Sequence, residues 1–238
     1  MNILITGSSS GIGQTLARRA VAAGHRVVLM ARRAPQLQAL AEELNGQQPG
    51  HAVVAPGDVG KRADCERAVA AGLEAFGELE ALVNAAGTWV EAPFAEVSYE
   101  EIERFVHTDI TGALQISRAI LPHLQQRGGG RLLHLNGLQG LIRQRPPVLY
   151  AAVESAVRGL CESLRWEAAG QGVHVGLLTL GAVANVELDN PELAVLEQQG
   201  KRQRLSRGEV AEAVLFMLSR PGGVNVDELV LTPLGQQL

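Results

Sequence analysis

Thr6-Gly7-Ser8-Ser9-Ser10-Gly11-Ile12-Gly13 is the stretch of this 238-residue chain that decides the fold. It follows a short apolar run, Asn2–Thr6, and it opens a segment of helical period, 13–23. Its glycines permit a tight strand-to-helix turn and let a pyrophosphate approach the backbone. The amino end of the helix then offers free N–H groups and a positive dipole end to phosphate. The stretch therefore favours a nucleotide site over a turn without a ligand.

The rest of the chain alternates short apolar runs with longer helical segments. The runs are bounded by Gly, Asp or Pro, which is typical of parallel strands buried on both faces; they span 2–6, 26–30, 51–55, 81–84, 131–136, 173–179 and 228–232. The helical segments span 13–23, 35–44, 61–76, 99–126, 149–169 and 207–219. This alternation predicts one α/β domain over 1–238, a doubly wound Rossmann-type parallel sheet of about seven strands with helices on both faces.

Composition and charge narrow the function classes. The chain is 46% hydrophobic and 19% charged with a net charge of −4, which describes an ordinary globular protein without a basic surface for nucleic acid. Cys65 and Cys161 lack metal-ligand spacing, so we expect reduced thiols and no metal site. No apolar run approaches the roughly 20 residues that span a bilayer. The amino end also lacks the basic region of a signal peptide. We therefore expect a cytoplasmic protein that does not bind membranes.

The TGxxxGxG spacing of the opening stretch resembles the phosphate loop of the short-chain dehydrogenase/reductase (SDR) family. Asp58-Val59, after the third run, resembles the family's adenine-contacting pair, and Asn84-Ala85-Ala86-Gly87, after the fourth, resembles its NNAG-type element beside the ribose. Tyr150 opens a helix at the expected distance, and the resemblance reaches to the tail over 225–233. It implies a dinucleotide site made of Gly7, Ser9, Ser10, Gly11, Ile12, Gly13, Arg32, Arg33, Asp58, Val59, Asn84, Ala85 and Gly87.

The end of the second run indicates which dinucleotide is bound. An NAD site usually places a carboxylate there to accept from the ribose 2′-OH, whereas this chain has Ala31-Arg32-Arg33. A guanidinium can pair with the 2′-phosphate of NADP(H) and stack on adenine. Two solvated arginines at a helix start are the alternative. We expect NADP(H) rather than NAD.

The resemblance also implies a catalytic centre, and there the chain departs from the family. The family reduces carbonyls with Ser, Tyr, Lys and Asn. Here Tyr150 is retained, but Glu154 stands four residues on in place of Lys, Gly137 thirteen residues before in place of Ser, and Asp109 in place of Asn. The spacing of four places Glu154 on the helix face of Tyr150, where we expect its carboxylate to raise the pKa of the phenol. Loss of one donor to an oxyanion costs on the order of 10² to 10³ in rate.

Other polar side chains can stand in for the missing groups. Asn136 adjoins the position of the lost Ser, and Asn185 replaces a Thr that the family uses over the nicotinamide. Further candidates near the expected pocket are Gln139, Gln144, His107 and His134, with Arg143 and Arg145 for an anionic substrate. For each of them a solvated position is the stronger interpretation, except that His134 in an apolar run suits a hydrogen-bonded core histidine.

Three functions remain open. The favoured one is a pseudoenzyme that keeps the fold in order to assemble. We expect a homo- or hetero-oligomer that forms through the helices over about 99–126 and 149–169. An active SDR sister chain is one candidate partner. The apolar spacing of Leu114, Leu121, Leu160 and Leu164 suits that interface, unless these leucines face only their own sheet. The second is an NADPH-dependent carbonyl or ketoacyl reductase with a rearranged site that uses Tyr150 and Asn136. The third is a nucleotide sensor whose NADP(H) occupancy changes the binding of a partner.

Overall fold

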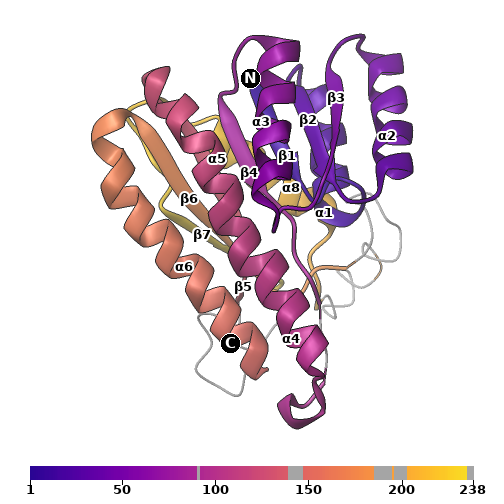
Figure 1. Ribbon diagram of the computed structural model, residues 1–238, viewed down its shortest axis with the longest axis vertical. Helices are drawn as coiled ribbons and strands as arrows, with labels where there is room; N and C mark the ends of the chain where they lie inside the picture. Colours follow the sequence, from indigo (N-terminus) through magenta and orange to yellow (C-terminus); the bar gives the residue numbers. More distant parts are fainter. Residues whose placement is uncertain (90–91, 139–146, 185–194, 196–202, 235–238) are drawn as a thin grey trace.

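A parallel sheet of seven strands forms the centre of the molecule (Figure 1). The computed structural model describes residues 1–89, 92–138, 147–184, 195 and 203–234. Neighbouring strands pair in the order β3-β2-β1-β4-β5-β6-β7, all of them parallel. Their bounds are β1 Asn2–Thr6, β2 Arg26–Ala31, β3 Ala52–Pro56, β4 Ala81–Asn84, β5 Gly130–Gly137, β6 Val173–Leu180 and β7 Glu228–Leu231. The predicted doubly wound sheet of about seven strands is confirmed.

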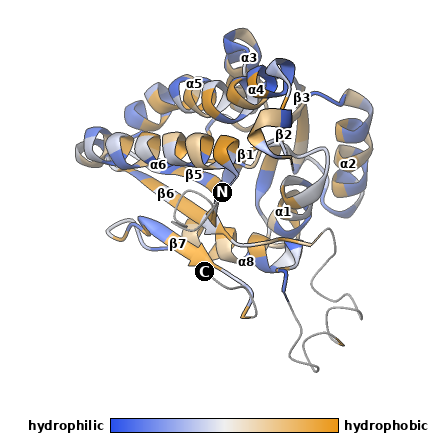
Figure 2. Ribbon diagram, turned by 90° about the horizontal axis from the view of Figure 1, so that it is seen from below, coloured by the Kyte–Doolittle hydropathy of each residue, from blue (hydrophilic) through white to orange (hydrophobic). Residues whose placement is uncertain are grey.

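Helices cover both faces of the sheet (Figure 2). One face packs against α1 Gly11–Ala22, α2 Ala34–Gln47 and α8 Arg207–Leu218. The other packs against α3 Arg62–Phe76, α5 Gly112–Gln126 and α6 Val148–Ala168. The shorter helices are α4 Tyr99–Phe105 and the 3₁₀ turns η1 Phe94–Glu96 and η4 Ala169–Gln171.

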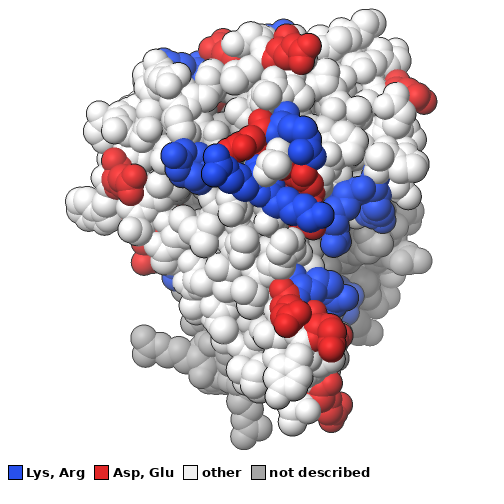
Figure 3. Space-filling view, in the orientation of Figure 1, with Lys and Arg blue, Asp and Glu red and all other residues white. Residues whose placement is uncertain are grey.

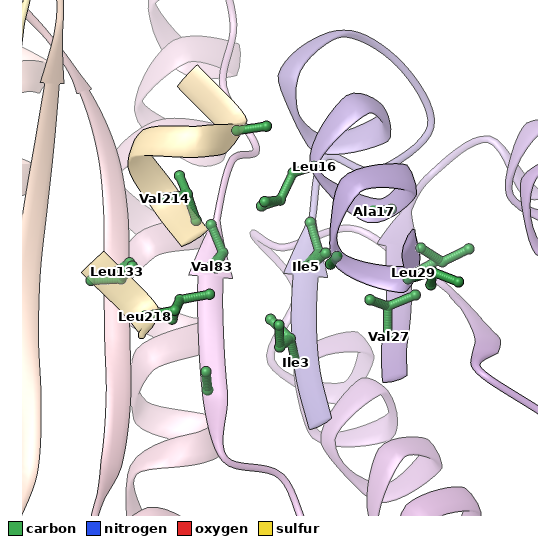
Figure 4. Close-up of a cluster of buried hydrophobic side chains, with 14 of the residues drawn as sticks. Ile3, Ile5, Leu16, Ala17, Val27, Leu29, Val83, Leu133, Val214 and Leu218 are labelled. Atoms are coloured by element: carbon green, nitrogen blue, oxygen red, sulfur yellow. The ribbon is translucent and has the colours of Figure 1, made fainter. Parts of the chain in front are cut away.

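Side chains of the central strand β1 alternate between two apolar clusters. Ile3 and Ile5 of β1 pack with Leu16 of α1 and Val214 of α8 (Figure 4), whereas Leu4 points to the α3–α5–α6 face. Because both faces of the central strands are covered, these strands are mostly apolar instead of alternating regularly between apolar and polar residues.

The strand order reverses between β1 and β4. β1 pairs with β2 on one side and β4 on the other, so the connections after β1 and β4 diverge toward opposite faces of the sheet. Ligands of doubly wound folds bind in the crevice beyond the carboxyl ends of the strands at such a reversal. The loop after β1 lies at this point, which places the glycine-rich stretch at the expected ligand edge.

The helix expected over 99–126 is not continuous. A π-helix, η2 Val106–Thr111, separates α4 from α5. A π-turn takes one residue more than an α-turn, and such turns often occur at functional sites. The apolar period continues on both sides of it, which is why the sequence predicted one helix.

The four leucines expected at an interface divide between the core and the surface. Leu121 and Leu164 are buried in the chain's own core and Leu160 packs against it, so these three face the sheet, as the alternative interpretation had it. Leu114 is half exposed. Acidic and basic side chains intermingle on the surface over α3, α5 and α6 (Figure 3). Among the described residues no helix combines the length and the apolar character needed to cross a membrane.

Candidate functional site

A cavity of about 330 Å³ lies at the strand-order reversal, and we call it the phosphate pocket. It is formed by the loop after β1, the ends of β2 and β3, and the segment after β4. Its lining residues are Gly7, Ser9, Ser10, Gly11, Ile12, Ala31, Arg32, Arg33, Gly57, Asp58, Val59, Ala85, Ala86, Gly87 and Thr108. The structure thus brings together eleven of the thirteen residues predicted to hold the cofactor: Gly7, Ser9, Ser10, Gly11, Ile12, Arg32, Arg33, Asp58, Val59, Ala85 and Gly87. Gly13 packs beneath the loop, and Asn84 lines the adjacent pocket.

Two glycines of the loop have no room for a side chain. Gly7 has a φ of 67°, and a Cβ there would lie 2.6 Å from the carbonyl oxygen of Ala85. A Cβ on Gly13 would lie 2.7 Å from the carbonyl oxygen of Gly7. The loop therefore packs on the segment after β4 and on the first turn of α1 at backbone contact distance, which only glycine allows.

The amino end of α1 is suited to an anion. Ser10 is the N-cap, yet its side chain makes no capping hydrogen bond, and the first turn has no acidic residue. The first N–H groups of the helix consequently lack an internal partner, and the positive end of the dipole faces the pocket.

Arg33 extends from the end of β2 onto the same loop. Its Nη2 donates to the Oγ atoms of Ser9 at 3.0 Å and Ser10 at 2.6 Å, and its Nε donates to Ser9 at 3.2 Å. A guanidinium and two hydroxyls therefore meet at the rim of the pocket. This set of donors fits a phosphate group.

A buried hydrogen-bonded chain fixes the strand ends behind the pocket. Thr6 Oγ1 donates to Asn84 Oδ1 at 2.6 Å, and the Asn84 side-chain nitrogen lies 3.2 Å from His134 Nδ1. His134 Nε2 lies 3.0 Å from Ser117 Oγ. Burial lowers the pKa of His134 to about 4, so the imidazole is neutral near pH 7. This is the hydrogen-bonded core histidine that the sequence suggested.

His107 does not reach the pocket that the family's chemistry would use. Its Nε2 lies 3.3 Å from Oδ2 of Asp58, one of the residues that line the phosphate pocket. Asp58 Oδ1 also accepts from the Gly60 N–H at 2.9 Å. These contacts hold the loop after β3 in place.

A second cavity of about 590 Å³, the inner pocket, continues from the first. The two share Ile12, Ala85, Ala86 and Gly87, so a ligand longer than the phosphate pocket extends into the inner one. The remaining lining residues are Asn84, Thr88, Trp89, Asp109, Leu135, Asn136, Gly137, Tyr150, Val153, Glu154, Val157, Leu180, Gly181, Ala182, Val183 and Arg204. All four positions of the family's catalytic set thus lie around one cavity.

Thr88 connects Tyr150 with Asp109. The Tyr150 hydroxyl donates to the Thr88 carbonyl oxygen at 3.2 Å, and the Thr88 hydroxyl donates to Asp109 Oδ2 at 2.7 Å. The Tyr150 ring is 4% exposed because Trp89 and Phe105 pack on it, with ring centroids 4.8 and 4.9 Å away. Burial raises the pKa of Asp109 to about 6, although the hydrogen bonds from Thr88 lower it.

Glu154 turns its carboxyl group toward β5. Its Oε2 accepts from the Gly137 N–H at 2.7 Å, which joins the two positions where the family has Lys and Ser. Burial raises the pKa of Glu154 to about 7, opposed by the Gly137 hydrogen bond and reinforced by the charge of Asp109. The side chain is therefore a mixture of neutral and ionised forms near pH 7.

Asn136 is buried beside these acids. It is 4% exposed, and within the described residues neither its Oδ1 nor its Nδ2 has a hydrogen-bond partner. The other stand-in candidates, Gln139, Arg143, Gln144, Arg145 and Asn185, lie outside the described residues. Sequence reasoning missed Thr88 as a pocket residue, although it directly follows the Asn84–Gly87 element.

Comparisons with known proteins agree with this geometry. The family profile for short chain dehydrogenases matches residues 1–193. An uncharacterized oxidoreductase of Listeria monocytogenes is 30% identical over 240 residues, covering 98% of this chain and 96% of its own, and one of Staphylococcus epidermidis is 27% identical over 230 residues, covering 97% and 96%.

Solved structures resemble the whole chain. The serine dehydrogenase of Escherichia coli is 28% identical with a TM-score of 0.86 and full coverage of both chains. A closed serine dehydrogenase complexed with NADP⁺ is 27% identical with a TM-score of 0.87, covering 100% of this chain and 97% of that one. An alcohol dehydrogenase of Thermococcus sibiricus complexed with 5-hydroxy-NADP is 28% identical with a TM-score of 0.85, covering 100% and 98%. The chain therefore belongs to the short-chain dehydrogenase/reductase family of oxidoreductases.

Proposed function

We propose that this chain binds NADP(H) and has lost most of the carbonyl-reducing activity of its family, so that it acts as a non-catalytic subunit beside an active reductase. The observation that carries the proposal is the Glu154 carboxyl group, hydrogen-bonded to the Gly137 N–H within the inner pocket. At these two positions the family's pattern has an ammonium and a hydroxyl donor.

The cofactor part of the proposal rests on the phosphate pocket. The uncapped end of α1 accommodates the pyrophosphate, and Arg33 with Ser9 and Ser10 accommodates the 2′-phosphate. Two of the similar solved structures hold NADP⁺ and 5-hydroxy-NADP, which supports the same cofactor class here. When bound, the cofactor supplies hydride chemistry; the residues above would bind and orient it.

The loss of reduction follows from the proton donors. A carbonyl that accepts hydride needs a donor for its developing negative oxygen. The Tyr150 hydroxyl donates to the Thr88 carbonyl oxygen, and its ring is packed between two aromatic rings. An ionised Glu154 repels an oxyanion, and Gly137 has no hydroxyl.

One observation favours a second function, an NADPH-dependent carbonyl or ketoacyl reductase with a rearranged site. The pKa of Glu154, raised by burial to about 7, leaves part of the population protonated at neutral pH. A neutral carboxylic acid can donate a proton, and Asn136 lines the same pocket with an amide that has no partner among the residues the structure describes. Such an enzyme would lose activity as pH rises through 7, because ionised Glu154 no longer donates.

The assembly part of the proposal rests on exposed side chains of α4, α5 and α6. Tyr99 of α4, Leu114 of α5 and Trp166 of α6 are 82%, 50% and 88% exposed. Exposed apolar and aromatic side chains on neighbouring helices are typical of interaction surfaces. We expect the partner to be a second copy of this chain or a related SDR chain.

Calorimetric titration with NADPH, run beside NADPH oxidation with a panel of ketones and β-ketoacyl thioesters, tests the function. We expect binding without turnover in the wild type, and measurable turnover in the double variant Gly137→Ser, Glu154→Lys, which restores the two donors. Absence of binding of both NADPH and NADP⁺ would contradict the cofactor assignment. Substantial wild-type turnover that falls in Glu154→Gln would instead establish the second function.

A further inference from the structure

Two carboxyl groups from separate elements face the inner pocket. Asp109 comes from the π-helix η2, and Glu154 comes from α6. Each is held in place by neutral donors, Asp109 by Thr88 and Glu154 by the Gly137 N–H. The charge of Asp109 reinforces the raised pKa of Glu154, so it opposes ionisation of that carboxyl group. The pair is therefore arranged so that a positive charge placed between or beside the two groups would stabilise both carboxylates.

Asn136 independently indicates that the inner pocket receives a polar ligand. Its side chain is buried at the pocket, and neither amide atom has a partner within the described residues. A buried amide without partners is costly unless a ligand or water completes its hydrogen bonds. One donor and one acceptor side by side are complementary to a carboxamide, the substituent of a nicotinamide ring.

The described residues that line the inner pocket carry two carboxyl groups and one basic side chain. The Tyr150 hydroxyl donates to the Thr88 carbonyl oxygen. Arg204, from the segment before α8, is the one cationic side chain among the described lining residues. It is exposed and has interactions of its own. Arg158, one turn after Glu154 on α6, pairs with Glu228 of β7 instead, at 2.8 Å.

We propose that Asp109 and Glu154 make this site select the oxidised cofactor, NADP⁺, over NADPH. The proposal rests on the proposed NADP(H) binding. The two cofactor forms share every phosphate and adenine contact, but the oxidised nicotinamide ring is positively charged and the reduced ring is neutral. In a partly desolvated pocket a carboxylate attracts the charged ring much more strongly than it would in water. The contacts in the phosphate pocket then set the overall affinity, and the two acids set the preference between the redox forms.

The preference is linked to protons. A cation that binds beside Asp109 and Glu154 favours their ionised forms, so NADP⁺ binding should release protons near pH 7, whereas NADPH binding should not. Both forms carry the 2′-phosphate, so its own protonation contributes equally to the two titrations. The difference in proton release between NADP⁺ and NADPH therefore reports the two acids alone.

Titration calorimetry of the full chain with NADP⁺ and with NADPH tests the proposal. At pH 8 we expect the Kd for NADP⁺ to be at least about tenfold lower than that for NADPH, which corresponds to about 1.4 kcal/mol. Titrations at pH 7 in buffers of different ionisation enthalpy should show net proton release for NADP⁺ alone. Glu154→Gln keeps the shape of the side chain and its hydrogen bond to Gly137 but removes the charge. We therefore expect the ratio of the NADPH Kd to the NADP⁺ Kd to fall at least about threefold.

Glu167→Gln is the matched control, because Glu167 lies exposed on the same helix, outside the residues that line the pocket. It should leave the ratio unchanged. Asp109→Asn provides a second neutral variant should Glu154→Gln not fold. Equal affinity of the wild type for both forms, with no difference in proton release, would overturn the selection while leaving NADP(H) binding intact. If neither form binds, the proposed function itself fails.

Discussion

At the scale of single residues, the identities at 109, 137 and 154 determine the chemistry of the inner pocket. The spacing of four from Tyr150 was enough to predict that Glu154 would lie beside the same cavity, and the structure places both there. The sequence did not reveal that Glu154 accepts a hydrogen bond from Gly137, because glycine contributes only its backbone there. It also did not reveal that Thr88 connects Tyr150 with Asp109, a residue of the π-helix.

Glu154 should make the stability of the protein depend on pH. Its pKa is raised by burial from 4.5 to about 7 in the folded state, so the folded chain holds the proton more tightly than the unfolded chain. The stabilisation that protonated Glu154 gives the folded chain is complete below pH 4.5 and is lost as pH rises through 7. The Glu154→Gln variant does not lose stability in this way, because its amide does not ionise. We expect it to match the wild type near pH 4.5 and to exceed it at pH 8 by up to about 3 kcal/mol in the free energy of unfolding.

Urea unfolding of both proteins across this range measures the effect. The comparison must be between variant and wild type, since Asp109 changes stability in the same direction and His134, whose folded pKa is lowered, in the opposite one. Glu167→Gln should show no such trend. A difference that stays constant from pH 4.5 to 8 would mean that Glu154 has an ordinary pKa.

At the scale of elements, the sequence predicted the strands within one or two residues and the helices within about three. Both predictions follow from physical requirements that leave a local pattern in the sequence. Parallel strands buried on both faces are mostly apolar, and helices begin and end at recognisable residues. The break at η2 Val106–Thr111 could not be predicted, because the apolar period resumes on its far side in α5.

Capping boxes at the amino ends of α4 and α8 allow a matched test of how burial changes the contribution of a helix cap. Ser206 begins α8 and Ser98 begins α4, and each accepts from the N–H of a glutamate three residues on, at 3.1 and 3.2 Å. Ser206 is buried whereas Ser98 is exposed. Ser206→Ala should therefore cost about 1–2 kcal/mol in the free energy of unfolding, because water cannot replace the lost acceptor, and Ser98→Ala about 0.5 kcal/mol. Denaturant unfolding of the two variants measures both values; equal losses would contradict the role of burial.

At the scale of the whole molecule, the doubly wound architecture was predictable because alternating strands and helices permit few topologies. The assembly was not. Leu121, Leu160 and Leu164 have the spacing of an interface, yet they face the sheet, since a helix that covers a sheet has the same apolar period as one that meets a partner.

We expect the purified chain to form an assembly heavier than its own 25.3 kDa. Leu114→Arg, which places a charge on the exposed face of α5, should lower the mass measured by light scattering. Phe216→Arg is the control, because Phe216 is 47% exposed on α8, a helix of the opposite sheet face. A wild-type chain that scatters as a monomer and brings no related reductase with it from its native host would contradict the assembly.

The wide turn of the π-helix η2 affects where the inner pocket acquires its negative charge. An α-helical residue advances by about 100°, so one surplus residue changes the direction in which the neighbouring side chains point without altering what α4 and α5 bury. A chain shorter by one residue within Val106–Thr111 could keep both helices and still contain an aspartate, but that aspartate would point elsewhere. The negative charge beside Thr88 is thus a matter of chain length as well as of residue identity, and sequences that differ here by a single deletion would differ in charge at the pocket.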